Sequence, residues 1–270
     1  MVVIITGGSS GIGLATARLY RDLGHTVYSI SRRSFNEEGI NHVIGDVCDF
    51  ESIKQAIDSI FEKEGRIDIL INNAGMGISG AIEDTLLEDA EYNFKVNFFG
   101  TFNTTKAVIP IMRNQGGGKI ANISSAAAIF PLPFQAFYSA TKSAINSFSE
   151  ALNIEVAPFN IQVCIFLPGD IKTDFTHNRK KNQIESKHYG ERIQKSVAVM
   201  EKDEQNGMSP DNAAKVIYNT LKKRRLPLYK VIGTKYKLFG FFAKLLPVRI
   251  KHFALRKLYG FVPKNKWLLD

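Results

Sequence analysis

Short β-branched runs alternate with amphipathic stretches along most of this 270-residue chain. The runs that we expect to form strands lie at 2–6, 26–30, 42–45, 67–71, 118–124, 161–167 and 229–232. Between them, apolar residues recur at three and four positions, which predicts helices near 12–23, 51–64, 86–113 and 136–157. Because this alternation is typical of βαβ units with right-handed crossovers, the sequence predicts an α/β fold, a doubly wound parallel sheet of about seven strands.

No linker rich in Pro, Gly or Ser divides the chain, and 44% hydrophobic residues suffice for one large core. We therefore expect a single domain over 1–270. Its regular part is 1–173. Residues 174–210 are polar and too long for an ordinary connection, which is typical of a loop over a binding site. The last part, 229–270, is predicted to be a basic amphipathic extension that is partly helical.

The positive charge is confined to the C-terminal part of the chain. Residues 1–211 carry 20 Lys and Arg against 25 Asp and Glu, whereas 212–269 carry 15 basic residues and no acidic one. An apolar helical stripe in this tail consists of Ile250, Phe253, Ala254 and Leu258. The basic residues that point elsewhere are Arg249, Lys251, Arg256 and Lys257.

Two interpretations of the tail stay open. A basic amphipathic segment with aromatic residues can contact an anionic membrane surface peripherally. The run Leu238–Phe242 supplies three phenylalanines for such a contact. Alternatively, the helix covers a substrate cleft or a neighbouring subunit. Nucleic acid is not expected as a partner, because no binding motif or base-stacking platform accompanies the basic residues.

Cysteine content and the ends of the chain bear on location. Cys48 and Cys164 are too few for a disulfide framework or a metal site, so we expect no metal and a reducing, cytoplasmic compartment. The N-terminus resembles no signal peptide, and no apolar stretch reaches the roughly 18 residues of a spanning helix.

A glycine-rich turn follows the first predicted strand and opens the first helix. At such a turn, backbone N–H groups and the helix dipole can hold the pyrophosphate of a dinucleotide. The spacing G-x-x-x-G-x-G differs from the general dinucleotide fingerprint, so a turn without a ligand is the alternative. The candidate cofactor-binding residues here are Gly7, Ser9, Ser10, Gly11, Ile12 and Gly13.

The second predicted strand ends in Arg32-Arg33, where an NAD-binding protein commonly has an acidic residue. Two guanidinium groups can grip a ribose 2′-phosphate, which favours NADP(H) as the cofactor. The alternative is a solvated pair of arginines, with Glu37 or Glu38 reaching back to the ribose. Further cofactor contacts are expected after the third and fourth strands, at Asp46, Val47, Asn73, Ala74 and Gly75.

Tyr138 and Lys142 are four residues apart on a predicted helix, so they share one face. A nearby ammonium group stabilises a phenolate and lowers the pKa of the phenol toward that of a general acid or base. Tyr218 and Lys222 have the same spacing but lie beside no glycine turn, and we interpret them as a solvated face. Near Tyr138, the fifth strand ends in Ser124-Ser125.

Taken together, these motifs resemble the short-chain dehydrogenase/reductase family over roughly residues 2–175. The resemblance is carried, in the family's order, by the 6–13 turn, 72–75, Asn97, Ser125, Tyr138, Lys142 and Pro168-Gly169. It implies a Rossmann-type fold in which 1–173 is the cofactor-binding and catalytic core and 174–210 the substrate loop. It also implies a homodimer or homotetramer packed through the helices near 86–113 and 136–157.

The resemblance assigns roles to the catalytic set. Tyr138 exchanges the substrate proton, and Ser125, thirteen residues before it, hydrogen-bonds the reacting oxygen. Lys142 holds the nicotinamide ribose and lowers the pKa of the tyrosine, while Asn97 supports a water-linked proton relay. The resemblance also places Tyr138, Lys142, Pro168, Gly169 and Thr173 against the cofactor.

The basic tail resembles the hydroxysteroid and retinol dehydrogenase-like branch of the family. Phe130 and Phe134 precede Tyr138 in an apolar segment without Lys or Arg, so a steroid, retinoid or long-chain alcohol or ketone is the expected substrate. Ser125 and Tyr138 would contact its oxygen. The alternatives are a 3-oxoacyl thioester reductase and, in another class, a non-catalytic NADP(H)-binding sensor or scaffold.

Overall fold

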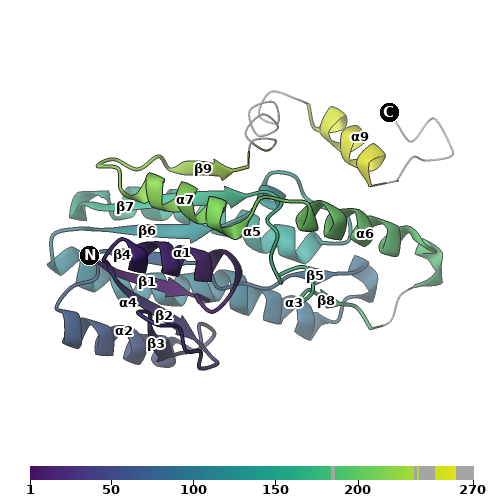
Figure 1. Ribbon diagram of the computed structural model, residues 1–270. Coiled ribbons are helices and arrows are strands. Elements are labelled where there is room, and N and C mark those ends of the chain that lie inside the picture. The colour runs from purple at the N-terminus through teal and green to yellow at the C-terminus, as the bar shows by residue number, and fades with distance from the viewer. Residues whose placement is uncertain (184–185, 234–235, 237–246, 260–270) are drawn as a thin grey trace.

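The structure is a computed structural model that describes residues 1–183, 186–233, 236 and 247–259 (Figure 1). The strands are β1 (Val2–Thr6), β2 (Thr26–Ser31), β3 (Asn41–Ile44), β4 (Ile69–Asn72), β5 (Ile78–Ser79), β6 (Gly118–Ile123), β7 (Ile161–Pro168), β8 (Lys180–Lys181) and β9 (Tyr229–Ile232). The helices are α1 (Gly11–Asp22), α2 (Phe50–Glu64), α3 (Leu87–Phe94), α4 (Gly100–Asn114), α5 (Ala136–Glu155), α6 (Arg192–Gln205), α7 (Pro210–Leu221) and α9 (Val248–Leu258). Short turns of helix are η1 (Ile82–Asp84), η2 (Lys95–Phe99), η3 (Ala126–Ala128), η4 (Ala157–Phe159) and η5 (Lys187–Tyr189).

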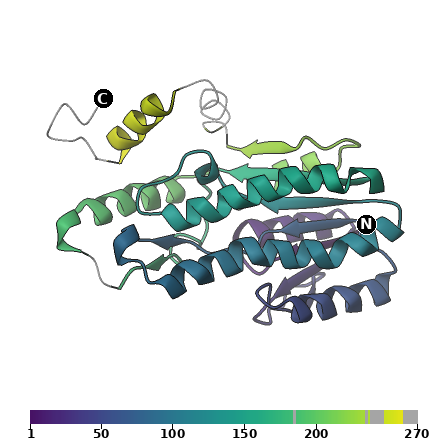
Figure 2. The same cartoon turned by 180° about the vertical axis from the view of Figure 1, so that it is seen from behind.

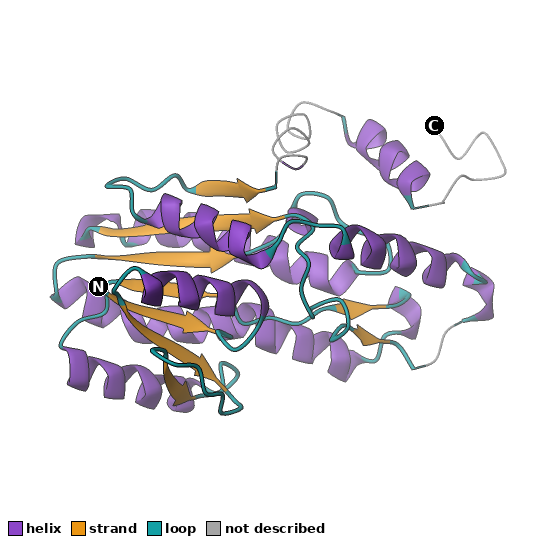
Figure 3. Cartoon of the chain, in the orientation of Figure 1, coloured by secondary structure: helices purple, strands orange, loops and turns teal. Residues whose placement is uncertain are grey.

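Within the described residues, seven strands form one sheet in the order β3-β2-β1-β4-β6-β7-β9 (Figure 3). Every neighbouring pair is parallel, from Tyr28 opposite Asn41 at one edge to Pro168 opposite Ile232 at the other. The order reverses beside β1, which is the topological switch point where ligands bind in such sheets. The predicted doubly wound α/β fold is therefore confirmed.

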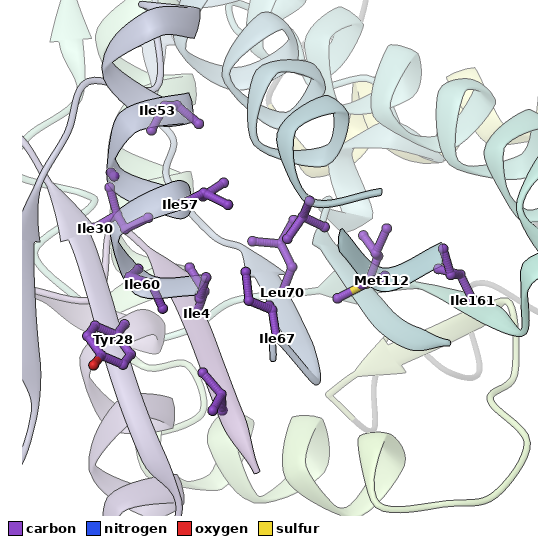
Figure 4. Packing of buried hydrophobic residues seen from close by; sticks show 14 of the residues in the cluster. Ile4, Tyr28, Ile30, Ile53, Ile57, Ile60, Ile67, Leu70, Met112 and Ile161 are labelled. Carbon is purple, nitrogen blue, oxygen red and sulfur yellow. The ribbon is translucent and has the colours of Figure 1, made fainter. Parts of the chain in front are cut away.

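Both faces of the sheet are covered, which explains why its central strands are continuously apolar. Figures 1 and 2 show α1 and α7 on one face and α2, α4 and α5 on the other. Ile53, Ile57 and Ile60 of α2 pack with Ile4 and Leu70 of the strands in one buried cluster (Figure 4). A second cluster joins the opposite face of the sheet to α1 and α7. These layers fix the carboxyl ends of the strands, where the site is expected.

Two predicted elements differ from the structure. The helix expected at 86–113 is interrupted by η2, a π-helical turn between α3 and α4. Such turns widen a helix locally and are frequent at functional sites. The segment 174–210, expected to be a loop, contains α6 with its buried residues Ile193, Val197 and Met200. The sparse apolar residues of α6 lie on one face, and the polar residues around them concealed the helical period.

The tail contributes α9, in which the side chains of Ala254 and Leu258, two residues of the expected apolar stripe, lie outside the described residues. Ile250 and Phe253 of the expected stripe are about half exposed, at 49% and 54%, whereas Tyr259 is 8% exposed and packs in a third cluster with residues of α6. The aromatic run 238–242 lies outside the described residues. Among the described residues, no helix is long and apolar enough to cross a membrane.

Candidate active site

A cavity of about 630 Å³ opens at the carboxyl ends of β1, β4, β6 and β7. Its described lining draws on the glycine turn, the loop after β4, the start of α5, the loop after β7, α6 and α9. Most of the predicted site residues meet there: Gly7, Ser9, Ser10, Gly11, Ile12, Asn73, Ala74, Gly75, Ser125, Phe130, Tyr138, Lys142, Pro168, Gly169 and Thr173. The sheet therefore brings together residues that are far apart in the sequence.

The glycine turn has no room for side chains at Gly7 and Gly13. Gly7 has φ +64°, and a Cβ there would lie 3.0 Å from the Ala74 Cα. At Gly13 a Cβ would lie 2.4 Å from the Gly7 carbonyl oxygen, so Gly13 packs α1 closely against the turn. Ser10 caps α1 without a side-chain hydrogen bond, in contrast to Asp49 at α2. The first N–H groups of α1 thus lack a side-chain partner, which suits a pyrophosphate.

Asn73 fastens the end of β4 to this turn. Its Nδ2 donates hydrogen bonds of 3.1 Å to the Thr6 carbonyl oxygen and 3.0 Å to the Gly7 carbonyl oxygen. In return, the Thr6 hydroxyl accepts from the backbone N–H groups of Asn73 and Ala74. These bonds set the shape of the turn before any cofactor is bound.

Ser125, Tyr138 and Lys142 come from adjacent elements. Ser125 follows β6, and its Oγ accepts a 3.1 Å hydrogen bond from the Ala127 N–H. Tyr138 and Lys142 lie on the first turns of α5, with the Lys142 Nζ 5.7 Å from the Tyr138 ring centroid. The Ser124 hydroxyl instead donates a 3.0 Å hydrogen bond to the backbone carbonyl oxygen of Lys142. This contact leaves Ser125 as the serine with an available hydroxyl beside Tyr138.

Burial shifts the pKa values of the catalytic pair in opposite directions. Desolvation raises the pKa of Tyr138 to about 12, although hydrogen bonding with Ser125 acts to lower it. Desolvation lowers the pKa of Lys142 to about 8, and its Nζ donates a 2.8 Å hydrogen bond to the Ile123 carbonyl oxygen. Burial therefore sets the direction of the Tyr138 pKa shift in this arrangement. The lowering of that pKa by Lys142, which the family resemblance implies, stays a prediction.

Asn97 is fully buried behind the cavity and does not line it. Its Oδ1 accepts from the Met76 N–H at 2.8 Å, and its Nδ2 donates to the Met76 carbonyl and to the Thr141 hydroxyl, both at 3.0 Å. The π-helical turn η2 places it there. A Cβ on Gly75 would lie 3.2 Å from its Oδ1 and 3.6 Å from the Lys142 Nζ, so Gly75 packs closely between these two groups.

Several predicted site residues lie away from the cavity lining. Arg32 and Arg33 are exposed at the end of β2, and Arg32 donates to the Tyr92 hydroxyl at 2.7 Å. Asp46 accepts from the Cys48 N–H, and Val47 is buried beside Gly100. Phe134, expected in the substrate pocket, packs against Tyr189 with ring centroids 5.6 Å apart. Its positive φ of 59° turns the chain just before α5.

A family model described as short chain dehydrogenase matches residues 1–184, more than half of the chain. The chain belongs to the short-chain dehydrogenase family. Its members are oxidoreductases, so this chain is an enzyme acting on alcohol or keto groups.

Relatives of this short-chain dehydrogenase extend the match. A 3-ketodihydrosphingosine reductase of Bacteroides thetaiotaomicron is 39% identical over 263 residues, 96% of this chain and 98% of the relative. An 11-beta-hydroxysteroid dehydrogenase-like 2 protein of Arabidopsis thaliana is 40% identical over 188 residues, 65% of this chain and 60% of the relative. A short-chain dehydrogenase of Streptomyces avermitilis has a similar structure, with a TM-score of 0.79, 30% identity, and coverage of 95% of this chain and 97% of that one. The expected hydroxysteroid dehydrogenase-like resemblance is confirmed.

The far end of the cavity in this short-chain dehydrogenase combines the apolar segment before Tyr138, which the sequence indicated, with residues of α6 and α9 that no sequence pattern singled out. Its apolar part is formed by Leu132, Met200, Leu255 and Tyr259, which come from three separate elements. The acidic residues of the lining are Asp170, Asp174, Asp203 and Glu204. Met200 and Glu204 share the inner face of α6, so recognition of that helix in the sequence would have been the signal for them.

Proposed function

We propose that this enzyme is an NADP(H)-dependent oxidoreductase that reduces the keto group of a long-chain, lipophilic substrate. NADPH, when bound, supplies the hydride. Tyr138 then donates the proton to the carbonyl oxygen, Ser125 hydrogen-bonds that oxygen, and Lys142 holds the cofactor ribose and stabilises the developing phenolate. Asn97 positions the Met76 backbone and the helix that carries Lys142, as its hydrogen bonds indicate.

The observation that carries the substrate class is the apolar end of the cavity beside Ser125 and Tyr138. Leu132, Met200 and Leu255 form a lipophilic wall, with no described basic residue beside them to hold a carboxylate. The 3-ketodihydrosphingosine reductase that matches nearly the whole chain acts, by its name, on a long-chain ketone. The apolar wall suits a lipophilic carbonyl of any of these classes, and the name of this relative favours a long-chain ketone over a steroid or a retinoid.

A substrate panel tests this proposal directly. Purified enzyme is followed optically for NADPH oxidation with 3-ketodihydrosphingosine, a ketosteroid, retinal, a neutral long-chain ketone and an acetoacetyl thioester. We expect the long-chain ketones to give the largest kcat/KM. Preference for the thioester would replace the proposal by a 3-oxoacyl thioester reductase. Tight NADPH binding without turnover of any compound would favour a non-catalytic sensor.

The preference for NADP(H) rests on the end of β2. Glu37, the acid that could have reached the ribose, is held by Arg18 in a 2.7 Å ion pair and contacts Arg21. Hydrogen bonds from Arg18 are the main reason that the pKa of Glu37 is lowered. Arg32 and Arg33 remain exposed at the strand end, ready for a phosphate.

Replacing both Arg32 and Arg33 with alanine should raise the KM for NADPH by about a hundredfold, because each charge-assisted hydrogen bond contributes about 1.5–3 kcal/mol. The KM for NADH should change little. Initial rates with each cofactor measure this. The matched control is Arg224→Ala with Arg225→Ala, a second exposed arginine pair beyond α7. An equal rise for both cofactors would contradict a 2′-phosphate contact.

Two partner surfaces complete the proposal. Exposed Phe99 and Phe102 on the α4 side favour a homodimer or homotetramer, which light scattering of the purified protein tests. On α9, exposed Ile250 and Phe253 accompany Arg249 and Arg256, a composition that favours peripheral contact with an anionic membrane. Sedimentation with anionic and neutral vesicles distinguishes that contact from a tail that only covers the cavity.

A further inference from the structure

Carboxylates outnumber cations around the catalytic cavity. Among the described residues of its lining, Asp170, Asp174, Asp203 and Glu204 are acidic, and Lys142 is the one basic residue. Lys142 is buried against the Ile123 carbonyl at the foot of the cavity, so it does not offset the acids of α6 and of the loop after β7. The substrate end is therefore both lipophilic and negatively charged.

The acids differ in how their charge is already compensated. Glu204 is paired with the buried guanidinium of Arg179 and accepts from the Thr176 hydroxyl at 2.6 Å. Asp170 accepts from the Tyr236 hydroxyl. Asp203, on the adjoining position of α6, has no hydrogen bond or ion pair with another described residue, and its side chain is exposed at the cavity.

Asp203 is nevertheless close enough to Tyr236 and Tyr259, two tyrosines of the cavity lining, for its charge to raise their pKa values. Burial is the main reason that the pKa of Tyr259 is raised, and the charges of Asp170, Asp203 and Glu204 raise it further. Burial likewise raises the pKa of Tyr236, where Asp203 adds a smaller contribution. The two phenols are neutral donors, so they do not compensate the charge of Asp203.

An independent sign of a polar ligand group is the amide of Gln135. This side chain is 3% exposed, lines the cavity and lies three residues before Tyr138. Its Nε2 has no hydrogen-bond partner among the described residues. A buried amide without a partner is costly and rare, so a ligand oxygen near the reacting carbonyl is the natural acceptor.

We infer that the cavity is built for an amphiphile with a protonated amino group next to the reacting ketone, its ammonium bound by Asp203 and a head-group oxygen bound by Gln135. The aliphatic chain then lies along Leu132, Met200 and Leu255. This inference rests on the proposed reduction of a long-chain ketone and names the residues that select its head group. A cation is favoured because it pairs with Asp203, whereas an anionic head group would be repelled by the uncompensated charge of Asp203.

The test compares 3-ketodihydrosphingosine, which has a free amino group, with its N-acetyl derivative, which has the same chain and ketone but no charge. We expect the wild-type kcat/KM to be at least tenfold higher for the free amine. In Asp203→Asn this preference should fall about tenfold, mainly through KM. Glu201→Gln is the matched control on α6, because Glu201 pairs with Lys181 and does not line the cavity.

A preference that survives in Asp203→Asn, or that falls equally in Glu201→Gln, overturns the role of Asp203. Equal rates on both substrates by the wild-type enzyme overturn recognition of the ammonium but leave the proposed function intact. Failure to reduce either substrate overturns this inference, and failure on the neutral long-chain ketone as well overturns the proposed function. For Gln135, Gln135→Met should lower kcat/KM about tenfold for 3-ketodihydrosphingosine but not for its analogue without the primary hydroxyl. Equal losses of kcat/KM on the two substrates would show that Gln135 has only a structural role.

Discussion

Replacing Tyr138 with phenylalanine should lower kcat for ketone reduction by about a thousandfold, the middle of the range for a lost general acid. The substitution removes one hydroxyl and keeps the ring that packs 5.6 Å from Phe175. Affinity for NADPH should stay within about twofold, because the glycine turn and the end of β2 are unchanged. Steady-state rates and titration of NADPH fluorescence measure the two quantities separately.

The chain contains a matched control for this variant. On α7, the Lys222 Nζ lies 5.6 Å from the Tyr218 ring centroid, almost the separation of 5.7 Å between Lys142 and Tyr138. Tyr218 packs edge-on against Tyr20 and is remote from the cavity lining. Tyr218→Phe should therefore leave turnover unchanged. Loss of NADPH binding together with turnover in Tyr138→Phe would contradict the assigned role.

The two Tyr–Lys pairs, on α5 and α7, show what sequence patterns can predict about the site. Spacing alone produces the same cation-to-ring geometry twice, so spacing does not distinguish a catalytic pair from a packed one. The distinction came from order along the chain, because a parallel sheet brings the glycine turn, Ser125 and Tyr138 to one edge. For the same reason, the doubly wound parallel sheet and most of the residues that line the cavity near the glycine turn could be predicted.

The substrate side could not be predicted in this way. Its walls depend on α6 and α9 packing over the carboxyl ends of the strands, in the cluster that joins Met200 to Tyr259. Neither contact has a local signature, because the apolar stripe of the tail did not include Leu255 and Tyr259, which line the cavity. Likewise, the π-helical turn that buries Asn97 depends on tertiary hydrogen bonds to Met76 and Thr141.

Lys142→Met should abolish turnover and, below pH 8, stabilise the fold. Lys142 is 5% exposed, and burial lowers the pKa of its ammonium group from 10.5 to about 8. That difference corresponds to roughly 3 kcal/mol of unfavourable burial, at about 1.4 kcal/mol per tenfold change. Loss of the hydrogen bond to the Ile123 carbonyl offsets about 1 kcal/mol. The expected net gain is about 2 kcal/mol, or a rise in Tm of about 4–8 °C.

The pH dependence identifies the cause of this gain. Because the pKa of Lys142 is lower in the folded than in the unfolded state, the unfolded chain binds more protons between pH 8 and 10.5. The burial penalty of the wild type is therefore fully present below pH 8 and disappears as the pH rises toward 10.5. Urea unfolding of both proteins at several pH values should show the stability advantage of Lys142→Met shrinking over this window.

A stability advantage that is constant with pH, or a less stable variant below pH 8, would contradict a buried charge. Lys222→Met, at an exposed position, is the control and should show neither effect. The stability of Lys142→Met therefore measures the cost of holding a buried ammonium group at the candidate active site.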